Sequence, residues 1–376
     1  MKTKQFWYPL PERLIAQHPS EKRGDDRMMV LHRDTGMVEH RRVTDFPEYI
    51  TANDLLVVND TKVFPARLLG TWSDSPGAVE VLMVHPAPSN EGPAPDPAEF
   101  VGGTGDASLL ERLEWTCLVG SGRPSRVGQV AVFGPNKELE VHFLEKMSGG
   151  MWKLRFESKR PLADLLDEFG HTPVPPYVRR EGTRDEELAD RDRYQTIYAK
   201  HVGSVAAPTA GLHFTPEIFA ALDAKGVKRV SVTLHVGPGT FRPVKADNIE
   251  DHEMDYEAFS VPPETAEAIN ACKARGGRVF CVGSTSVRTL ETVASRARGP
   301  EDPLVVAGSG ASNIFIYPPY TFKVCDCMLT NFHLPQSTLL MMTSALAGRE
   351  RMLISYALAV KANYRFFSYG DCMLIV

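Results

Sequence analysis

The sequence predicts an α/β main domain, with a mixed sheet flanked by helices, that is interrupted by an inserted small β-barrel domain. Three observations support this fold class. The chain has 376 residues, more than the roughly 250 at which a single hydrophobic core stops growing. Apolar runs followed by polar turns and helical patterns, typical of buried parallel strands, occur early and late in the chain. Between residues 68 and 156, short alternating runs are separated by Gly, Pro, Asn and Ser, as in small closed barrels.

These patterns set the expected domain boundaries. We expect residues 1–67 and 157–376 to form the discontinuous α/β domain, and residues 68–156 to form the inserted barrel domain. A Pro- and Gly-rich stretch at about 85–110 predicts a loop within the barrel domain.

Composition limits the possible environments of the protein. The net charge of −5 argues against electrostatic coating of long nucleic acid, although it leaves room for a local basic patch. No apolar run approaches the roughly 20 residues of a membrane span, and the first residues lack the apolar core of a signal peptide. We therefore expect a cytoplasmic, monomeric protein without a membrane partner. The six cysteines are widely spaced and should be reduced, mostly buried thiols.

The first part of the main domain offers one candidate ligand position. Residues 54–58 contain a continuous apolar run from Leu55 to Val58, which predicts a strand buried on both faces. Asn59 and Asp60 follow this strand, at the position where open α/β sheets bind ligands. A simple turn explains the same two residues equally well.

After the barrel, Leu162, Leu165 and Leu166 have helical spacing, and Gly170 should end that helix. An arginine-rich segment with interleaved acids and tyrosines comes next. Its mixture of positive and negative charges favours a solvated surface, and an RNA-contacting face is the alternative. The arginines of interest are Arg179, Arg180, Arg191 and Arg193.

The stretch from residue 204 to residue 242 has two glycine-rich turns, each beside a histidine, His213 and His235. Thr215 and Pro216 predict a helix start, and a strand should follow at residues 229–236. We expect a strand–helix–strand unit with a right-handed crossover, which places both histidines on one rim of the sheet.

The C-terminal third adds further polar groups at the ends of predicted strands. A buried strand is followed by a Gly-Ser-Thr-Ser turn and a helix that carries Arg288 at its start, where an anion or plain capping would fit. Thr330, Asn331, Phe332 and His333 end a later strand, and Ser337 or Thr338 lies in the first turn of the next helix. His252 and Glu253 lie in an acidic setting between these regions.

These residues allow proton-transfer chemistry without a metal. The four histidines at strand ends or in turns have no i, i+4 pairing, although a metal site assembled from distant segments is an alternative. The sequence lacks a nucleophile elbow, a P-loop and a dinucleotide-binding glycine motif. We therefore expect an enzyme that uses His, Glu, Arg, Asn and Asp side chains around a cleft.

Several longer sequence segments are more specific than these patterns. APTAGLHFT, LHVGPGTFRPV, VGSTSVRTLE, TNFHLPQSTLLM, YRFFSYGD and DLLVVNDTKVFPARL together resemble the S-adenosylmethionine:tRNA ribosyltransferase-isomerase family of queuosine biosynthesis. The resemblance spans nearly the whole chain in order. It implies transfer and isomerisation of the ribosyl group of S-adenosylmethionine onto 7-aminomethyl-7-deazaguanine (preQ1) at the tRNA wobble position. Epoxyqueuosine in tRNA, adenine and methionine would be the products.

The resemblance also implies partners for the protein. The partners are S-adenosylmethionine as co-substrate, with no permanently bound cofactor, and a tRNA anticodon loop carrying preQ1. The sequence departs from the usual family pattern near His252. Family members usually have a second histidine where this chain has Asp255. A methyltransferase that uses the same co-substrate, a metal-dependent hydrolase and a non-catalytic RNA-binding module are the competing functions.

The predicted site has three groups of residues. The general base should be His213 or His235, with His252 or His333 assisting adenine departure. Arg288 would hold the methionine carboxylate, and aromatic side chains would face the sulfonium. The catalytic set is His213, His235, His252, His333 and Glu253. The substrate-binding set is Asp60, Thr209, Phe214, Thr240, Arg242, Arg288, Asn331, Phe332, Ser337, Tyr369 and Asp371, and the four arginines form the RNA-binding set.

Overall fold

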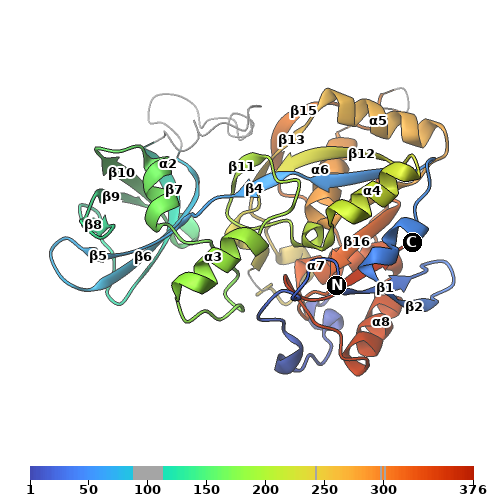
Figure 1. Cartoon of the computed structure of the whole chain (residues 1–376), viewed down its shortest axis with the longest axis horizontal. Helices are drawn as coiled ribbons and strands as arrows, with labels where there is room; N and C mark the ends of the chain where they lie inside the picture. The colour runs from blue at the N-terminus through green and yellow to red at the C-terminus, as the bar shows by residue number, and fades with distance from the viewer. Residues whose placement is uncertain (88–112, 242–243, 297–298, 300–301) are drawn as a thin grey trace.

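A computed structural model describes residues 1–87, 113–241, 244–296, 299 and 302–376, without the side chains of residues 240 and 241. Its largest element is a nine-stranded mixed sheet (Figure 1). The strands in sheet order are β15 (Gly308–Ser312), β13 (Glu257–Val261), β12 (Lys228–Leu234), β3 (Leu55–Asn59), β14 (Val279–Val282), β16 (Cys327–Asn331), β17 (Cys372–Ile375), β1 (Arg27–Leu31) and β2 (Val38–Arg42). The central strands β12, β3, β14 and β16 are parallel, and antiparallel pairs occur toward both edges, so the predicted mixed sheet is confirmed.

The strand β3 is buried at all five positions, and its first four residues are apolar. Leu55 and Val57 belong to the core cluster under α5 (Pro263–Ala274) and α6 (Gly283–Ser295). Leu56 and Val58 face the opposite cluster, which contains residues of α4 (Pro216–Ala224). Because side chains alternate across a strand, a strand that is covered on both faces favours a continuous apolar run.

Six antiparallel strands form the closed barrel that the alternating runs predict. They are β5 (Arg67–Trp72), β6 (Ala78–Pro86), β7 (Glu114–Ser121), β8 (Val130–Phe133), β9 (Leu139–Lys146) and β10 (Met151–Ser158). Most of the predicted loop at about 85–110 lies outside the described residues. The helix α2 (Leu162–Phe169) ends at Gly170 as expected, and it buries Leu162, Leu165 and Leu166 in the barrel core. We propose to keep the domain division at residues 68–156, with α2 attached to the barrel.

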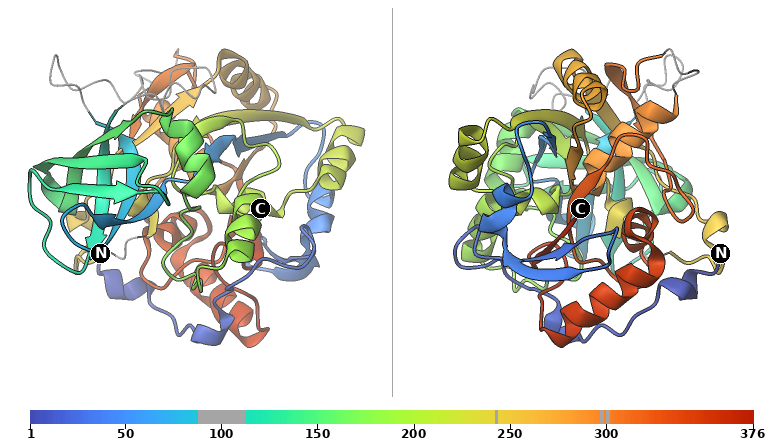
Figure 2. Two further views of the ribbon diagram at one scale, coloured as in Figure 1. Left: turned by 60° about the vertical axis from the view of Figure 1, so that its left-hand side comes forward. Right: turned by 90° about the vertical axis from the view of Figure 1, so that its right-hand side faces the viewer.

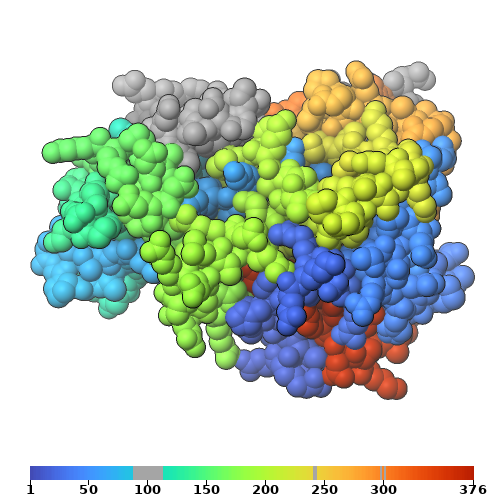
Figure 3. Space-filling model, in the orientation of Figure 1, coloured from blue at the N-terminus to red at the C-terminus, as the bar shows by residue number. Residues whose placement is uncertain are grey.

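A short parallel pair, β4 (Thr61–Val63) and β11 (His201–Ser204), lies between the barrel and the main sheet (Figure 1). The expected strand–helix–strand unit within one sheet is therefore wrong at its first strand, because β11 pairs with β4 and β12 pairs with β3. The helix α3 (Arg184–Arg193) belongs to the segment that bridges barrel and N-terminal residues on the surface in Figure 3.

The C-terminal helices α7 (Thr338–Ala347) and α8 (Arg349–Lys361) pack on each other, and Figure 2 shows α8 beside β1 and β2. One local prediction needs correction. The Gly-Ser-Thr-Ser stretch is the first turn of α6 rather than a separate turn, so Arg288 is the sixth helical residue. Of the two residues expected in the first turn of α7, Thr338 is the first helical residue. Ser337 is the N-cap, where its side chain accepts a hydrogen bond from the Leu340 N–H at 3.2 Å.

Short 3-10 turns complete the described structure: η1 (Thr3–Phe6), η2 (Glu12–Leu14), η3 (Val43–Glu48), η5 (Ser148–Gly150), η6 (Thr209–His213), η7 (Pro238–Phe241) and η8 (Ile249–Asp251). All six cysteines are free and buried, as expected. None of the helices in the described ranges has the length and apolar character that a bilayer crossing requires.

Candidate active site

A cavity of about 80 Å³ lies at the carboxyl ends of β14 and β16, between the first turns of α6 and α7. We call it the central cavity. Ligands of open α/β sheets bind at this edge, because loops and helix N-termini converge there. Five of the predicted site residues line it: Thr209, Asn331, Phe332, His333 and Ser337.

The N-terminus of α6 contributes polar groups to this cavity. Gly283 has a φ of +79°, a conformation that favours glycine, and this lets β14 turn directly into the helix. Gly283, Ser284 and Thr285 line the cavity. The buried hydroxyl of Thr285 has no hydrogen-bond partner among the described residues. Unpaired donors at a helix N-terminus fit a polar or anionic substrate group.

An aromatic wall closes another side of the central cavity. Tyr177 stacks on Phe367 with ring centroids 4.5 Å apart, and its hydroxyl lies 2.6 Å from the Ser368 hydroxyl. Phe367 has a φ of +71°, which is rare for a bulky residue and typical of functional loops. Tyr177 and Phe367 could not be identified as site residues from the sequence, because no spacing relates position 177 to position 367.

His213 lies in a chain of hydrogen bonds behind the cavity wall. Its Nδ1 is 2.8 Å from a carboxylate oxygen of Asp26, and its Nε2 is 3.1 Å from the Asn331 amide nitrogen. The Thr209 hydroxyl donates a hydrogen bond to the side-chain amide oxygen of Asn331 at 3.2 Å. Because the Asn331 amide donates to Nε2, the proton of the neutral imidazole is on Nδ1 and points to Asp26. This arrangement orients the ring as catalytic histidines are oriented by a carboxylate.

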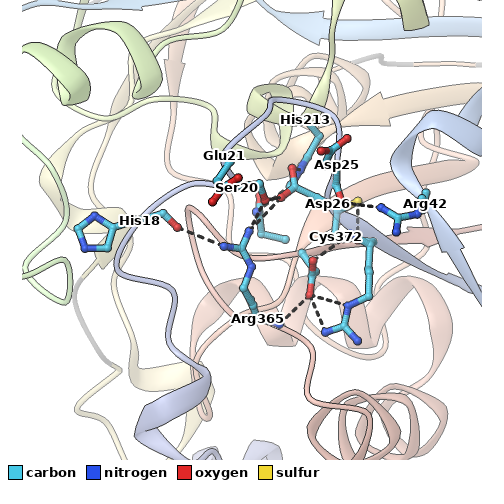
Figure 4. Close-up of polar contacts among 12 residues, drawn as sticks. His18, Ser20, Glu21, Asp25, Asp26, Arg42, His213, Arg365 and Cys372 are labelled. Carbon is cyan, nitrogen blue, oxygen red and sulfur yellow. Dashed lines mark hydrogen bonds and ion pairs between the residues drawn. The ribbon is translucent and has the colours of Figure 1, made fainter.

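Figure 4 shows Asp26 at the centre of this network, with Ser20, His213 and Arg365 around it. Burial raises the pKa of the Asp26 carboxyl, but His213, Ser20 and Arg365 lower it by more, so the pKa lies below its ordinary value. Asp26 is thus held as a carboxylate. No pattern in the sequence pointed to Asp26, since the contact joins positions 187 residues apart.

The buried His333 and the half-buried His235 differ from His213, because neither has an acidic partner of this kind among the described residues. His333 lines the central cavity and lies 2.9 Å from the Thr330 hydroxyl, and burial lowers its pKa to about 3. His235 lies 2.7 Å from the Thr61 hydroxyl and packs against Gly203, away from the central cavity. Burial, with a smaller effect of His201, lowers the pKa of His235 to about 4. Both rings are therefore neutral near pH 7.

A second cavity, of about 390 Å³, lies beside α6 and the start of α7. We call it the acidic cavity. It is lined by Gly239, Lys245, Ala246, Asp251, His252, Glu253, Met254, Asp255, Glu257, Arg288 and Thr338. Arg288 is buried and pairs with Glu257. Burial lowers the pKa of His252, while Asp255 raises it to a smaller extent.

Four predicted substrate residues line neither of these two cavities. Phe214 is fully buried among Phe46 and Phe219, and Asp60 accepts a hydrogen bond from Thr233 at 2.7 Å. Tyr369 donates to Asp190 at 3.0 Å, and Asp371 binds Arg27. These contacts hold the fold together, and the substrate role of these four residues stays a prediction. Arg242 and the side chain of Thr240 lie outside the described residues.

The predicted RNA-binding arginines differ in exposure. The Arg180 guanidinium is buried and binds Asp190 through two hydrogen bonds of 2.8 Å. Arg191 donates to the carbonyl oxygens of Asp167 and Gly170, and Arg193 donates to that of Ser20. Arg179 alone of the four has a side chain exposed by as much as 81%, in a pair with Glu12. Three of the four are thus tied to the protein itself.

His252 and four acidic residues line the acidic cavity, but they are not arranged as a set of metal ligands. Within the part of the chain that the structure describes, no group of three or more His, Cys, Asp or Glu residues is placed to hold a metal ion.

Comparisons with known proteins identify similar chains over the full length. The family described as queuosine biosynthesis protein matches residues 3–375. The S-adenosylmethionine:tRNA ribosyltransferase-isomerase of Thermoanaerobacter sp. (strain X514) is 45% identical over 376 residues, covering 100% of both chains. The enzyme of the same name from Acetivibrio thermocellus is 44% identical over 378 residues, also covering 100% of both chains. The crystal structure of S-adenosylmethionine tRNA ribosyltransferase from Thermotoga maritima is 34% identical with a TM-score of 0.52, over 99% of this chain and 100% of that one.

Proposed function

The chain belongs to the queuosine biosynthesis protein family, and on that premise we propose that it is an S-adenosylmethionine:tRNA ribosyltransferase-isomerase. It transfers and isomerises the ribosyl moiety of S-adenosylmethionine onto preQ1 at the tRNA wobble position, giving epoxyqueuosine-tRNA, adenine and methionine. The observation that carries this proposal is the central cavity at the carboxyl ends of parallel strands, with the carboxylate-paired His213 behind its wall.

The proposed chemistry begins with proton removal. The sulfonium acidifies the C5′ hydrogens of S-adenosylmethionine, so a general base removes one as adenine leaves. The aminomethyl nitrogen of the tRNA base then attacks the opened sugar, and closure of the epoxide expels methionine. The protein must supply a base, a polar environment for adenine and an anchor for the methionine end.

We assign the base to His213 rather than His235. Asp26 accepts a hydrogen bond from Nδ1 of His213 and orients its ring, whereas burial disfavours a proton on His235. In the structure the Asn331 side-chain amide donates a hydrogen bond to Nε2 of His213. Proton transfer to Nε2 therefore requires this amide to turn to another hydrogen-bond partner. A bound adenine or ribose offers such a partner. Asn331 thereby couples substrate binding to release of the base.

The remaining roles follow from position. His333 lines the same cavity as Asn331, and its low pKa makes it a hydrogen-bond partner of departing adenine rather than a full proton donor. Phe332 contributes an apolar face to the cavity, where a sulfonium can lie against the ring. Arg288, in the acidic cavity, binds the methionine carboxylate.

The tRNA partner enters through its anticodon loop. A base in a single-stranded loop can be splayed out into a protein pocket, while cationic side chains hold the adjacent phosphates. Among the four arginines, Arg179 has the exposure that a phosphate contact needs. A monomer remains our prediction for the assembly state.

Mass analysis of the products tests the proposed function. The protein is incubated with S-adenosylmethionine and tRNA that contains preQ1, and the expected products are free adenine, methionine and a heavier tRNA base. S-adenosylhomocysteine in place of adenine would support a methyltransferase. Loss of activity on adding a chelator would support a metal-dependent hydrolase. Absence of adenine release would overturn the proposal.

A further inference from the structure

The two carboxylate oxygens of Asp26 have different partners, and this determines how Asp26 holds His213. Oδ2 accepts a hydrogen bond from Nδ1 of His213 at 2.8 Å. Oδ1 accepts hydrogen bonds from the Ser20 hydroxyl and from the Arg365 guanidinium, the latter at 3.0 Å. Two donors on one oxygen fix the plane of the carboxylate, so the other oxygen stays directed at the imidazole.

A single nitrogen of Arg365 reaches both Ser20 and Asp26. Nη2 lies 2.6 Å from the Ser20 hydroxyl oxygen and 3.0 Å from Oδ1 of Asp26. Nη1 lies 3.3 Å from the His18 carbonyl oxygen. Figure 4 shows the guanidinium among these groups. Arg365 thus joins the N-terminal segment that carries Asp26 to the C-terminal part of the chain.

The backbone of Arg365 is held in a closed turn at residues 365–371. The Arg365 N–H donates to Oδ2 of Asp371 at 2.7 Å, and the Asp371 N–H donates to the Arg365 carbonyl oxygen at 2.8 Å. A Cβ at Gly370 would lie 2.5 Å from that carbonyl oxygen, so this close approach requires glycine. The turn therefore fixes the point from which the Arg365 side chain extends.

The same turn also reaches the other side of the His213 ring. Its Phe367 carbonyl accepts a hydrogen bond from the Asn331 side-chain amide at 3.1 Å, and that amide donates to Nε2 of His213 at 3.1 Å. The turn thus contacts the partners of both ring nitrogens. Of these two contacts, the one made by Arg365 depends on a side chain and can be tested by substitution.

Arg365 is the cationic partner of Asp26 in the described part of the chain. Arg23 and Arg193 line a cavity of about 20 Å³ together with Asp26 and His213. Both of these guanidinium groups donate to main-chain carbonyl oxygens. Among the arginines and lysines of the described ranges, only Arg365 forms an ion pair with the Asp26 carboxylate. Such charge-assisted hydrogen bonds are stronger than neutral ones.

We propose that Arg365 is a positioning residue for the reaction, which holds the Asp26 carboxylate in the orientation that directs the His213 ring toward Asn331 and the central cavity. This role rests on the assignment of His213 as the general base under the proposed function. Arg365 lines neither the central cavity nor the acidic cavity, so it acts through Asp26 and not on the substrate.

The kinetics of adenine release test this role. Arg365→Gln should lower kcat by about tenfold or more, the effect of losing one charge-assisted hydrogen bond, and leave KM for S-adenosylmethionine within about twofold of wild type. Arg365→Lys should restore most of the lost kcat, because one ammonium nitrogen can donate to both Ser20 and Asp26. Wild-type kcat in Arg365→Gln would overturn the proposal.

Arg278→Gln is the matched control for these measurements. The Arg278 side chain is 43% exposed and pairs with the buried Asp54, whereas that of Arg365 is 35% exposed and pairs with the buried Asp26. Arg278 lines neither cavity, so its kcat should stay within about twofold of wild type even if the fold loses some stability.

A double-mutant cycle distinguishes positioning from a general loss of structure. In an Asp26→Asn protein, Arg365→Gln should change kcat by less than about twofold, because the group through which Arg365 acts is already absent. A further loss of about tenfold in that background would mean that Arg365 acts independently of Asp26. That result would overturn the proposal.

Nuclear magnetic resonance of the protein with isotope-labelled histidine tests the same role without substrate. The Nδ1–H of the buried His213, identified by its loss in His213→Gln, should exchange slowly with water because Asp26 accepts it. Arg365→Gln should speed this exchange by about tenfold or more, whereas Arg365→Lys and Arg278→Gln should not. If Arg365→Gln fails to fold, Arg365→Lys decides: slow exchange in this variant supports the role, and fast exchange overturns it.

The exchange measurement separates this inference from the proposed function. Equal exchange in wild type and Arg365→Gln, together with adenine release by wild type, would overturn the role of Arg365 and leave the proposed function standing. Faster exchange in Arg365→Gln, without adenine release by wild type, would uphold the positioning of His213 by Arg365 and overturn the proposed function.

Discussion

At the scale of single residues, His213 differs from the other predicted histidines in its partners. It alone contacts a buried carboxylate, Asp26, and it reaches the central cavity through Asn331. His235 and His333 each bind a hydroxyl instead, and burial holds their pKa values near 4 and 3. The hydrogen-bond partners therefore distinguish His213 as the candidate general base, whereas the sequence context alone does not distinguish these histidines.

Asp26→Asn should lower kcat by about 10²-fold to 10⁴-fold, the range attributed to general acid–base catalysis, because the His213 ring loses the carboxylate that orients it. Adenine release at saturating substrates measures this. Asp54→Asn is the matched control, since Asp54 is also buried and paired with an arginine but lines neither cavity. A wild-type kcat in the Asp26→Asn variant would contradict the assignment of His213 as the general base.

The depressed pKa of His333 predicts a pH dependence of stability. An unfolded histidine has a pKa of about 6.5, whereas His333 stays neutral in the fold down to about 3. Between these values the unfolded chain binds a proton that the folded protein does not. The stability contribution is therefore complete above pH ~6.5 and is lost as the pH falls toward 3, by up to about 1.4 kcal/mol per pH unit.

His333→Gln removes this titration. Denaturant unfolding at several pH values should show the variant losing less stability than wild type below pH ~6.5, so the two curves converge on acidification. His18→Gln, a change at an exposed histidine, is the control, and its curve should run parallel to wild type. A parallel curve for His333→Gln would contradict the assigned burial effect.

At the scale of elements, the segment that contains α3 shows that similar arginines can have opposite roles. Arg180 and Arg191 bind acceptors within the protein, whereas Arg179 extends into solvent. The sequence shows mixed charges along this segment but does not show which charges are already paired. Only the packing of α3 against α2 and the N-terminal residues decides that.

Arg179→Ala should weaken tRNA binding and reduce the salt dependence of that binding by about one charge, without a change in Tm. Arg180→Ala should instead destabilise the fold by about 3–5 kcal/mol, because Asp190 would be left buried without its cation. Filter binding at several salt concentrations and thermal unfolding measure the two effects. Arg160→Ala, on an exposed pair with Glu168, is the control for both. Unchanged tRNA affinity in Arg179→Ala would remove this residue from the RNA surface.

At the scale of the whole molecule, the barrel and the main sheet have separate hydrophobic cores. Trp72, Trp115 and Trp152 all lie in the barrel cluster, and the fourth tryptophan of the chain, Trp7, is 58% exposed. Tryptophan fluorescence thus reports mainly on the barrel. Far-UV circular dichroism reports mainly on the helices that cover the main sheet.

Gly70→Ala should lower the fluorescence midpoint in a denaturant titration and leave the dichroism midpoint in place. A Cβ at Gly70 would lie 2.4 Å from the Val132 carbonyl oxygen, where β5 meets β8 to close the barrel. Gly120→Ala is the matched control in the same barrel, because its Cβ would lie 3.7 Å from Glu80, an ordinary contact. A common shift of both midpoints in Gly70→Ala would mean that the two parts unfold as one unit.

The sequence by itself determined the elements and the family. Apolar runs predicted β3 and β14, alternation predicted the barrel, and the Thr215 cap placed the start of α4. These signals are local, because hydrogen bonding and burial within one element repeat at two or 3.6 residues. Central-cavity residues such as Asn331 and His333 followed from the same rule, since they lie at a strand end.

The tertiary structure alone decided which side chains meet. It joined His213 to Asp26 across 187 positions and brought Tyr177 onto Phe367. Among the described residues, it left Nε and Nη2 of the buried Arg288 without a hydrogen-bond partner. It also placed Phe214 in the core and tied Arg180 to Asp190. Contacts between distant segments depend on how layers pack, and no periodicity along the chain records them.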